Sequence, residues 1–197
     1  MSYEPSAAEV KELRGITGAG IMECKTVLKE TAGNIEAAVK LQRERGIVKS
    51  AKRADRETTE GVLASYIHGN RVGVLVEIGC ETDFVAGTDE FKAFAQEIAL
   101  QIAALPDTRY VSREDVPAEL VAAELEIYVV QAADRPEQVR EKIAQGKLAK
   151  WYEGVVLLDQ ASVRDGEQTI EQMRAALSAT TGENVKIKRF ARFERGA

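Results

Sequence analysis

Carboxylates and one phenylalanine gather in a short connector, residues 79 to 90, with the sequence GCETDFVAGTDE. Glu81, Asp83, Asp89 and Glu90 offer oxygen ligands for a metal ion, or a carboxylate pair for acid–base chemistry. Their spacing does not follow the D-x-D-x-D-G pattern of a calcium loop. Asp89 and Glu90 also fall in the first turn of a predicted helix, where carboxylates interact favourably with the helix dipole. We therefore expect no metal site in this connector.

Phe84 in the same connector has two readings. Its side chain either folds back under the following helix as a hydrophobic staple, or projects as an aromatic anchor for a protein partner. The residue types around it allow both, and the sequence pattern alone leaves the choice open.

Other chemistry has few residues to use. The single histidine, His68, falls at a predicted hairpin turn, and the chain contains no GxSxG, P-loop or GxGxxG motif. Cys24 and Cys80 lie far apart without CxxC spacing, so we expect reduced thiols. These patterns predict a protein without catalytic residues or a nucleotide-binding loop of its own.

The composition is that of a globular protein. Of 197 residues, 45% are apolar and 30% are charged, and the net charge of −5 argues against an indiscriminate nucleic-acid binder. The first ten residues, MSYEPSAAEV, lack the apolar stretch of a signal peptide, and no run of about 18 apolar residues occurs. We expect a cytoplasmic protein.

Residues 1–48 are predicted to form a small module of three helices, over residues 7–14, 20–32 and 35–45. In the second of these, Ile21, Cys24, Val27 and Leu28 recur at a spacing of three and four residues, which is typical of a buried helical face. The third is expected to stop at Gly46.

A basic helical linker, residues 49–60, is expected to follow the module. Residues 40 to 57 carry a net charge of +4, which indicates either a solvated helix or a contact with an acidic partner or RNA.

Residues 61–197 are predicted to form an α+β core, an antiparallel sheet with helices covering one face. Strands 61–68 and 71–79 flank Gly69-Asn70, a two-residue hairpin signal. Phe91, Phe94, Ile98 and Ile102 form the apolar stripe of a helix that begins at Thr88. The remaining predicted elements are helices over 117–133 and 136–146, a strand over 154–160, a helix opened by Thr169, and a terminal strand over 184–193.

Several long motifs occur together in one order. They are TGAGIMECK, LQRERGIVKSAKRADRETTEG, RVGVLVEIGCETDFVAG and GENVKIKRFARFERG. In this order and spacing they resemble the elongation factor Ts family, in its short bacterial form, over the whole chain. The resemblance implies an N-terminal module similar to ubiquitin-associated (UBA) domains, then an α+β core without an inserted coiled coil.

The resemblance also implies a function. Members of this family are guanine-nucleotide exchange factors for elongation factor Tu in translation elongation, and bind it both with GDP and free of nucleotide. Thr82, Asp83, Phe84 and Val85 would form the loop that displaces Mg²⁺ from the partner. Leu13, Ile21 and Met22 of the helical module would contact its GTPase domain; Ile21 stands where the family commonly has methionine.

The same resemblance implies no cofactor and no covalent chemistry. It favours a homodimer, which would be non-covalent because Ala191 occupies a position where a cysteine could have linked two copies. The terminal strand carries a basic edge, expected to contact the partner's distal domain or a second copy rather than nucleic acid; its residues are Lys186, Lys188, Arg189, Arg192 and Arg195.

Two other functions remain as alternatives at this point. A UBA-like adaptor could bind RNA through the basic linker and the basic edge, without exchange activity. A small hydrolase could use the acidic connector, and would then depend on Asp83.

Overall fold

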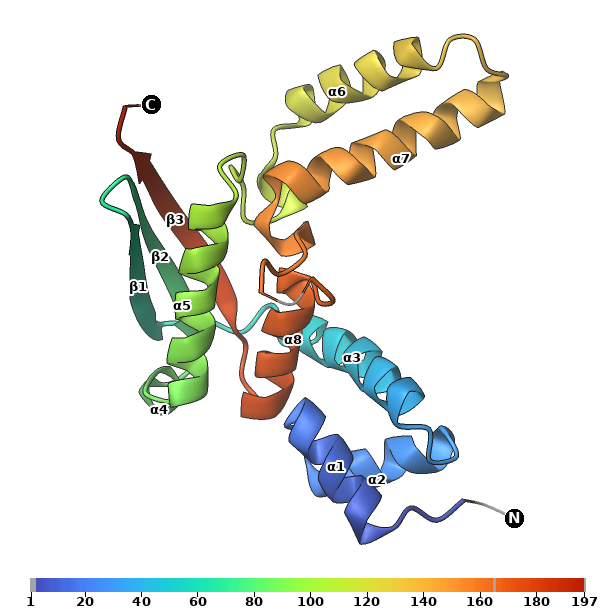
Figure 1. Cartoon of the computed structure of the whole chain (residues 1–197), viewed down its shortest axis with the longest axis vertical. Coiled ribbons are helices and arrows are strands. Elements are labelled where there is room, and N and C mark those ends of the chain that lie inside the picture. The colour runs from blue at the N-terminus through green and yellow to red at the C-terminus, as the bar shows by residue number, and fades with distance from the viewer. Residues whose placement is uncertain (1–2, 165, 197) are drawn as a thin grey trace. The chain divides into compact units, whose positions relative to one another are not determined.

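The computed structural model describes residues 3–164 and 166–196. It divides into two compact units, each assembled from separate stretches of the chain. The first unit contains residues up to 64, 77–95 and 171–187, and the second contains residues 65–76, 96–170 and 188 onward. Figure 1 labels the elements in chain order. No helix in the described ranges is long and apolar enough to cross a membrane.

The first unit begins with a three-helix module, as predicted: α1 (Ala7–Thr17), α2 (Ile21–Glu30) and α3 (Ile35–Ala51). Ser6 caps α1 in a reciprocal capping box with Glu9, and the Asn34 side chain caps α3. The core of the module is made by Val10, Leu13, Cys24, Val27, Leu28 and Ala38, all buried. These three helices therefore share a small hydrophobic core of their own, which is consistent with a UBA-like fold.

The prediction that the third helix stops at Gly46 is wrong, because α3 continues to Ala51. Gly46 is buried, and a Cβ added there would lie 3.9 Å from the carbonyl oxygen of Ala175 in α8 (Ile170–Thr181). Beyond the glycine, the Arg53 guanidinium donates a hydrogen bond to the Ser178 carbonyl at 3.2 Å. Glycine costs only about 1 kcal/mol in a helix interior, and packing against α8 offsets that cost.

The sheet has three strands in the order β1-β2-β3: β1 (Glu60–His68), β2 (Val72–Cys80) and β3 (Lys186–Glu194). The hairpin turn between β1 and β2 is confirmed: Gly69 and Asn70 have φ values of 52° and 56°, and the Arg71 amide donates to the His68 carbonyl at 2.9 Å. Positive φ at both central residues defines the type I′ turn, which matches the twist of the paired strands.

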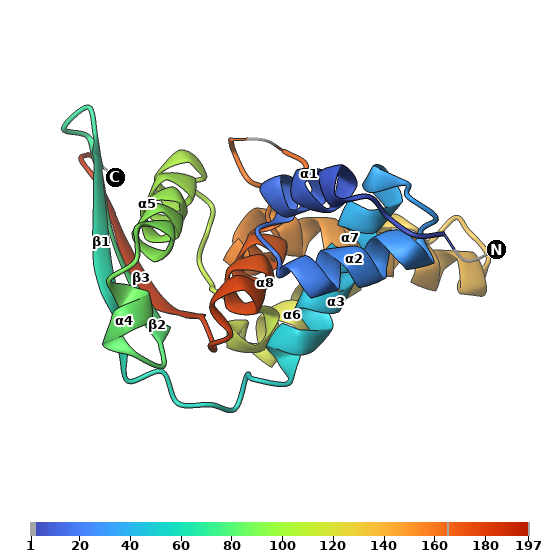
Figure 2. The same cartoon turned by 90° about the horizontal axis from the view of Figure 1, so that it is seen from below.

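Two helices follow β2 directly, the short α4 (Asp83–Ala86) and the long α5 (Asp89–Ala104). The predicted stripe of α5, Phe91, Phe94, Ile98 and Ile102, is buried, and the Thr88 hydroxyl caps the helix by accepting from the Phe91 amide at 3.2 Å. Both views show α5 lying along one face of the sheet (Figures 1 and 2). The predicted α+β class is confirmed.

In the second unit, α6 (Ala118–Gln131) and α7 (Glu137–Val155) pack on each other as a helical hairpin (Figure 1). The two helices predicted in this region are confirmed, but α7 continues through Gly146 instead of ending there.

The strand predicted over 154–160 is also wrong. Val155 ends α7, Val156 makes an isolated bridge with Tyr110, and η2 (Leu157–Asp159) is a turn of 3₁₀ helix, like η1 (Arg113–Asp115) earlier in the chain. Val156 and Leu157 are fully buried. A short buried apolar run has no period that separates a strand from a helix end, so the sequence pattern did not decide between them.

Candidate functional site

The connector after β2 folds into a short turn that presents its aromatic side chain to solvent. Thr82 is the N-cap of α4, and its Oγ1 accepts a hydrogen bond from the Val85 amide at 3.4 Å. Phe84 is 84% exposed, Asp83 is exposed, and Val85 is half-buried. We call Thr82–Val85 the projecting turn. The interpretation of Phe84 as a staple is therefore wrong, since a side chain that is 84% exposed is not covered by the following helix.

The carboxylates of the connector do not converge on one point. Glu81 Oε1 accepts from the Asn184 amide at 2.6 Å and from the Arg56 guanidinium at 3.3 Å, whereas Asp83 lies exposed in the projecting turn. Within the described ranges, no group of three or more His, Cys, Asp or Glu side chains is placed to hold a metal ion. The Glu81 carboxylate thus accepts hydrogen bonds within the chain, whereas the Asp83 carboxylate contributes negative charge to the surface.

Sequence reasoning missed Glu183, which contacts the start of the projecting turn. Its carboxylate accepts from the amides of Glu81 and Thr82 at 3.0 and 3.1 Å, and from the Thr82 hydroxyl at 2.6 Å. These residues are about a hundred positions apart in the chain. The motif GENVKIKRF contains Glu183, but only the fold shows that its carboxylate meets these donors.

Cys80 also forms a hydrogen bond to the start of the projecting turn. Its Sγ donates to the Thr82 carbonyl at 3.2 Å, and burial, together with the nearby negative charge of Glu183, raises the pKa of the Cys80 thiol. A protonated thiol can act as this donor. Both cysteines are free, as expected, and both are buried.

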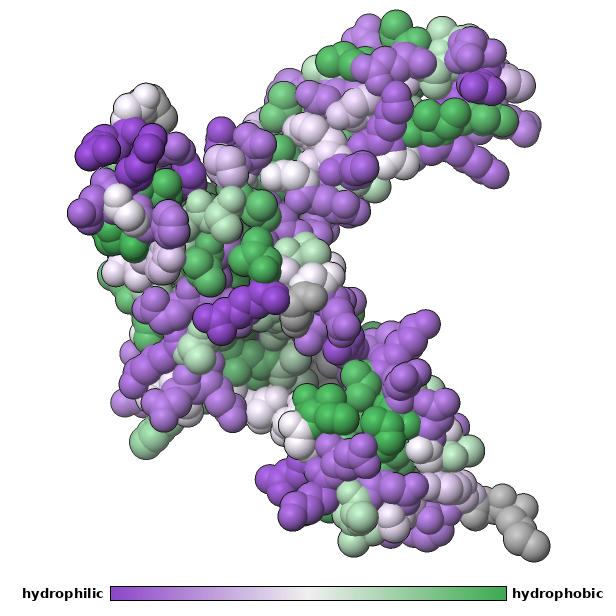
Figure 3. All heavy atoms as spheres, in the orientation of Figure 1, coloured by the Kyte–Doolittle hydropathy of each residue, from purple (hydrophilic) through white to green (hydrophobic). Residues whose placement is uncertain are grey.

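The helical module brings two of its three predicted contact residues to the surface. Ile21 is 56% exposed and Met22 is 73% exposed at the start of α2, and Ile16, in the last turn of α1, is also exposed. Figure 3 shows hydrophobic side chains gathered on the surface of this module. Ile21 also lines a shallow groove with Val10, Arg14 and Lys25.

Leu13, the third predicted contact residue, does not join them. Its side chain is completely buried in the core of the module. The resemblance named Leu13 together with Ile21 and Met22, but its burial separates it from these two exposed side chains.

Comparison with known proteins places these motifs in one family. The family model described as "Elongation factor TS" matches residues 4–197. The chain belongs to the elongation factor Ts family. The elongation factor Ts of Caldanaerobacter subterraneus subsp. tengcongensis is 49% identical over 194 residues, covering 97% of this chain and 96% of the relative. That of Thermosipho melanesiensis is 50% identical over 194 residues, covering 97% and 98%, and that of Thermotoga neapolitana is 47% identical, covering 98% of both.

As a member of the elongation factor Ts family over nearly its whole length, the chain is a guanine-nucleotide exchange factor for elongation factor Tu in translation elongation. The function therefore acts on a nucleotide held by another protein. The surface of the chain, and not an internal cavity, is where its functional residues are to be sought.

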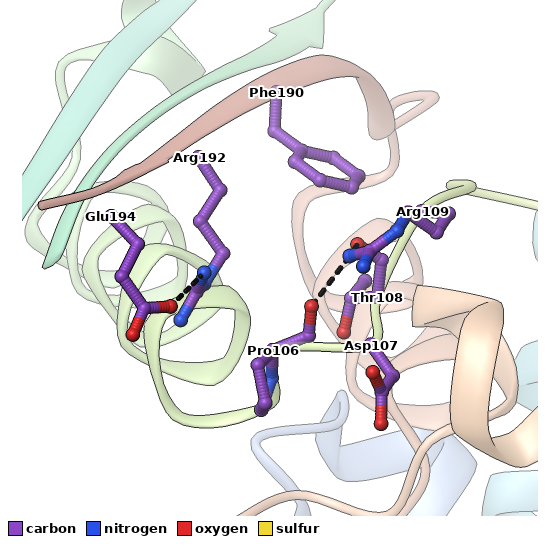
Figure 4. A pocket seen from close by; sticks show the side chains of 7 residues that line it. All are labelled: Pro106, Asp107, Thr108, Arg109, Phe190, Arg192 and Glu194. Atoms are coloured by element: carbon purple, nitrogen blue, oxygen red, sulfur yellow. Dashed lines mark hydrogen bonds and ion pairs between the residues drawn. The ribbon is translucent and has the colours of Figure 1, made fainter. Parts of the chain in front are cut away.

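The second unit contains a hollow, whose lining can be compared with the exposed projecting turn. Figure 4 shows Phe190, Arg192 and Glu194 of β3 facing the loop 106–109 across it. Arg192 is paired with Glu194 at 2.8 Å, and the Arg109 guanidinium donates to the Pro106 carbonyl. The lining contains no histidine, serine or cysteine, and Asp83, on which the hydrolase alternative depends, is not among its residues.

Proposed function

We propose that this chain promotes GDP release by inserting the projecting turn, with Phe84 foremost, beside the nucleotide site of elongation factor Tu. The observation that carries this proposal is the exposure of Phe84 on a capped and hydrogen-bonded turn. An exposed aromatic side chain is a common anchor at protein interfaces. In this mechanism Thr82 caps the turn, Asp83 brings negative charge toward the partner's Mg²⁺, and the half-buried Val85 adds apolar surface beside Phe84 in the sequence.

The energetics define how much Phe84 can contribute. Burying one phenylalanine contributes about 1.5–3 kcal/mol, and each tenfold change in affinity takes about 1.4 kcal/mol. Phe84 therefore accounts for about ten- to a hundredfold of the loss of nucleotide affinity. Displacement of Mg²⁺ supplies the rest, because the ion neutralises phosphate charge in the partner. By linkage, the factor binds the nucleotide-free partner more tightly than the GDP-bound partner by the same coupling free energy.

A second contact holds the partner through the helical module. Ile21 and Met22 supply exposed apolar surface for the GTPase domain, and Leu13 supports that surface from the core beneath. The functional division that follows is residues 1–48 as a binding module, 49–60 as a linker, and 61–197 as the core that carries the projecting turn.

We further propose that two copies associate non-covalently through the outer sheet patch, which we define as Ile67, Leu75 and Phe193. These three apolar side chains are exposed, and Ile67 and Phe193 line one shallow groove. Exposed apolar patches of this kind mark protein interfaces. Both cysteines are buried and Ala191 stands on β3, so the dimer would have no disulfide. Phe193→Asp should convert dimers to monomers in light scattering; a monomeric wild-type protein at working concentration would overturn the dimer.

The chain is proposed to act in the cytoplasm without covalent chemistry, cofactor, metal of its own or direct contact with nucleic acid. Three arginines within residues 40–57, the segment of net charge +4, form ion pairs or hydrogen bonds within the chain. Arg45 pairs with Glu30, Arg53 donates to the Ser178 carbonyl, and Arg56 pairs with Glu81. Arg192 of the basic edge is paired with Glu194. These contacts disfavour the adaptor alternative, which predicts strong, salt-dependent binding to RNA.

The test is release of a fluorescent GDP analogue from elongation factor Tu, with wild type, Phe84→Ala and a control, Val130→Ala. Val130 is exposed on α6 and takes no part in the proposed contacts. The proposal predicts fast release with wild type and Val130→Ala, and slow release with folded Phe84→Ala. Equal rates for all three would overturn it.

A further inference from the structure

The turn between α8 and β3 is hydrogen-bonded both to α8 and to the projecting turn. Gly182 ends α8 with a positive φ of 77°, and its amide donates to the Ser178 carbonyl at 3.0 Å. The Ser178 hydroxyl in turn donates to the Glu183 carbonyl at 2.6 Å. The backbone of Glu183 is therefore fixed by α8 before its side chain makes any contact.

The carboxylate of Glu183 bonds to three donors of the segment that enters the projecting turn. One carboxylate oxygen accepts hydrogen bonds from the adjacent amides of Glu81 and Thr82, and the other accepts a hydrogen bond from the Thr82 hydroxyl. The Thr82 hydroxyl donates its hydrogen bond to the Glu183 carboxylate. Its lone pairs therefore remain available to accept a hydrogen bond from the Val85 amide. Glu183 thus fixes both the backbone before α4 and the cap of α4 itself.

A second set of bonds runs in the opposite direction. The Asn184 amide donates to Glu81 Oε1 at 2.6 Å, and the Asn184 side chain, 2% exposed, donates to the carbonyls of Ala54 and Arg56 at 3.2 and 2.9 Å. Glu183 therefore bonds to the projecting turn, while the neighbouring Asn184 bonds to the linker that follows the helical module. We call this dipeptide the 183–184 clamp.

Apart from Glu183, further side chains bond to the projecting turn: Cys80 Sγ donates to the Thr82 carbonyl at 3.2 Å, and the Thr88 hydroxyl donates to the Val85 carbonyl at 2.8 Å. α4 contains only four residues, and Ala86 is the one that is buried. A helix of one turn is unstable alone, because nucleation fixes several residues for one hydrogen bond. Bonds to a charged acceptor are stronger than bonds between neutral groups, so the carboxylate is the main external constraint on the direction of Phe84.

We propose that Glu183 is a positioning residue for nucleotide exchange, which holds the projecting turn in the conformation that presents Phe84 to the partner. The inference rests on the proposed role of Phe84. A turn that is already ordered loses less conformational entropy when it inserts, so more of its contact energy is available to weaken nucleotide binding. Removal of the carboxylate should leave Phe84 present but poorly directed.

The test compares Glu183→Ala and Glu183→Gln with wild type, with Glu141→Gln as the control. Glu141 is an exposed carboxylate on α7. GDP release is measured over a range of exchange-factor concentrations, which separates the maximal rate from the half-saturating concentration. We expect Glu183→Ala to lower the maximal rate about tenfold, equivalent to about 1.4 kcal/mol, with a half-saturating concentration within about twofold of wild type. Glu183→Gln should be intermediate, since an amide oxygen still accepts the backbone bonds.

Two further readouts separate positioning from general destabilisation. Hydrogen exchange of the segment 79–86 should be faster in Glu183→Ala than in wild type, while the α6–α7 hairpin is unchanged. In a Phe84→Ala background, Glu183→Ala should slow release by less than about twofold, because the side chain that it directs is already absent.

The outcomes are distinct. If Phe84→Ala slows release and Glu183→Ala does not, the positioning role is overturned and the proposed function stands. If Glu183→Ala slows release equally with and without Phe84, it acts through another element and the inference is also overturned. If Phe84→Ala itself has no effect, both proposals fail. Should Glu183→Ala unfold below the assay temperature, Glu183→Gln and Thr82→Val decide by the same criteria.

Discussion

The two surfaces proposed to bind elongation factor Tu are held in different ways. Ile21 and Met22 lie on helices that share a hydrophobic core, so the position of these side chains depends on packed volume. Phe84 lies on a four-residue helix whose position depends on hydrogen bonds to Glu183. A surface supported by packing fails when its module unfolds, whereas a turn held by polar bonds can fail while the fold persists.

Leu13→Ala should give the largest effect on the packing side of this comparison. Leu13 is completely buried, and replacing a buried leucine by alanine costs about 2–5 kcal/mol. We expect the helical module to unfold at clearly lower urea concentration, followed by circular dichroism. Met22→Ala, which removes an exposed side chain, is the control and should unfold like wild type. A Leu13→Ala protein as stable as Met22→Ala would contradict the core assignment.

Ile21→Ala combined with Met22→Ala should weaken binding without loss of fold. The pair exposes apolar side chains that the proposed contact would bury, and a loss of about 1.5–3 kcal/mol corresponds to about ten- to a hundredfold in affinity. Calorimetric titration into nucleotide-free elongation factor Tu measures the change. The maximal rate of GDP release at saturation should stay near that of wild type, in contrast to Phe84→Ala; a reduced maximal rate would show that the two surfaces do not have separate roles.

Loss of an N-cap should have different consequences in the two regions. Ser6→Ala removes the cap of α1 and should lower the stability of the module by about 1 kcal/mol. Thr82→Val removes the cap of α4 and should accelerate amide exchange within residues 82–86 while the urea midpoint hardly moves. Hydrogen exchange and urea unfolding of both variants test this. Equal losses of global stability would mean that the projecting turn is part of the cooperative core.

The smallest predicted effect is a pH dependence in the module. Hydrogen bonds from the Ser6 hydroxyl, the Tyr3 hydroxyl and the Ser6 amide lower the pKa of Glu9 from 4.5 to about 2. A pKa that is lower in the folded state gives stability that is present above the unfolded value and is lost as pH falls toward the folded value. Wild type should therefore be more stable than Glu9→Gln at pH 6, and the difference should shrink between pH 4.5 and 2. A constant difference across that range would exclude this role for Glu9.

The sequence predicted those elements whose signals are local. Gly69-Asn70 specified its turn through positive φ, and the spacing of Phe91, Phe94, Ile98 and Ile102 specified the buried face of α5. Gly46 and Gly146 gave false helix ends, because a glycine weakens a helix only slightly and tertiary packing decides.

The candidate site was predictable only in part for the same reason. Its motif identified Thr82–Val85, but exposure of Phe84 and burial of Leu13 are properties of packing between distant segments. Glu183 meets Thr82 across about a hundred residues, and no local pattern encodes that bond.

GDP release from elongation factor Tu by Phe84→Ala tests the central claim most directly. The account predicts that this variant retains the stability of wild type and still binds the partner through Ile21 and Met22. With the variant at saturating concentration, elongation factor Tu should release GDP about ten- to a hundredfold more slowly than with wild type. A folded Phe84→Ala variant that releases GDP as fast as wild type would contradict the claim that the projecting turn is the element that displaces nucleotide.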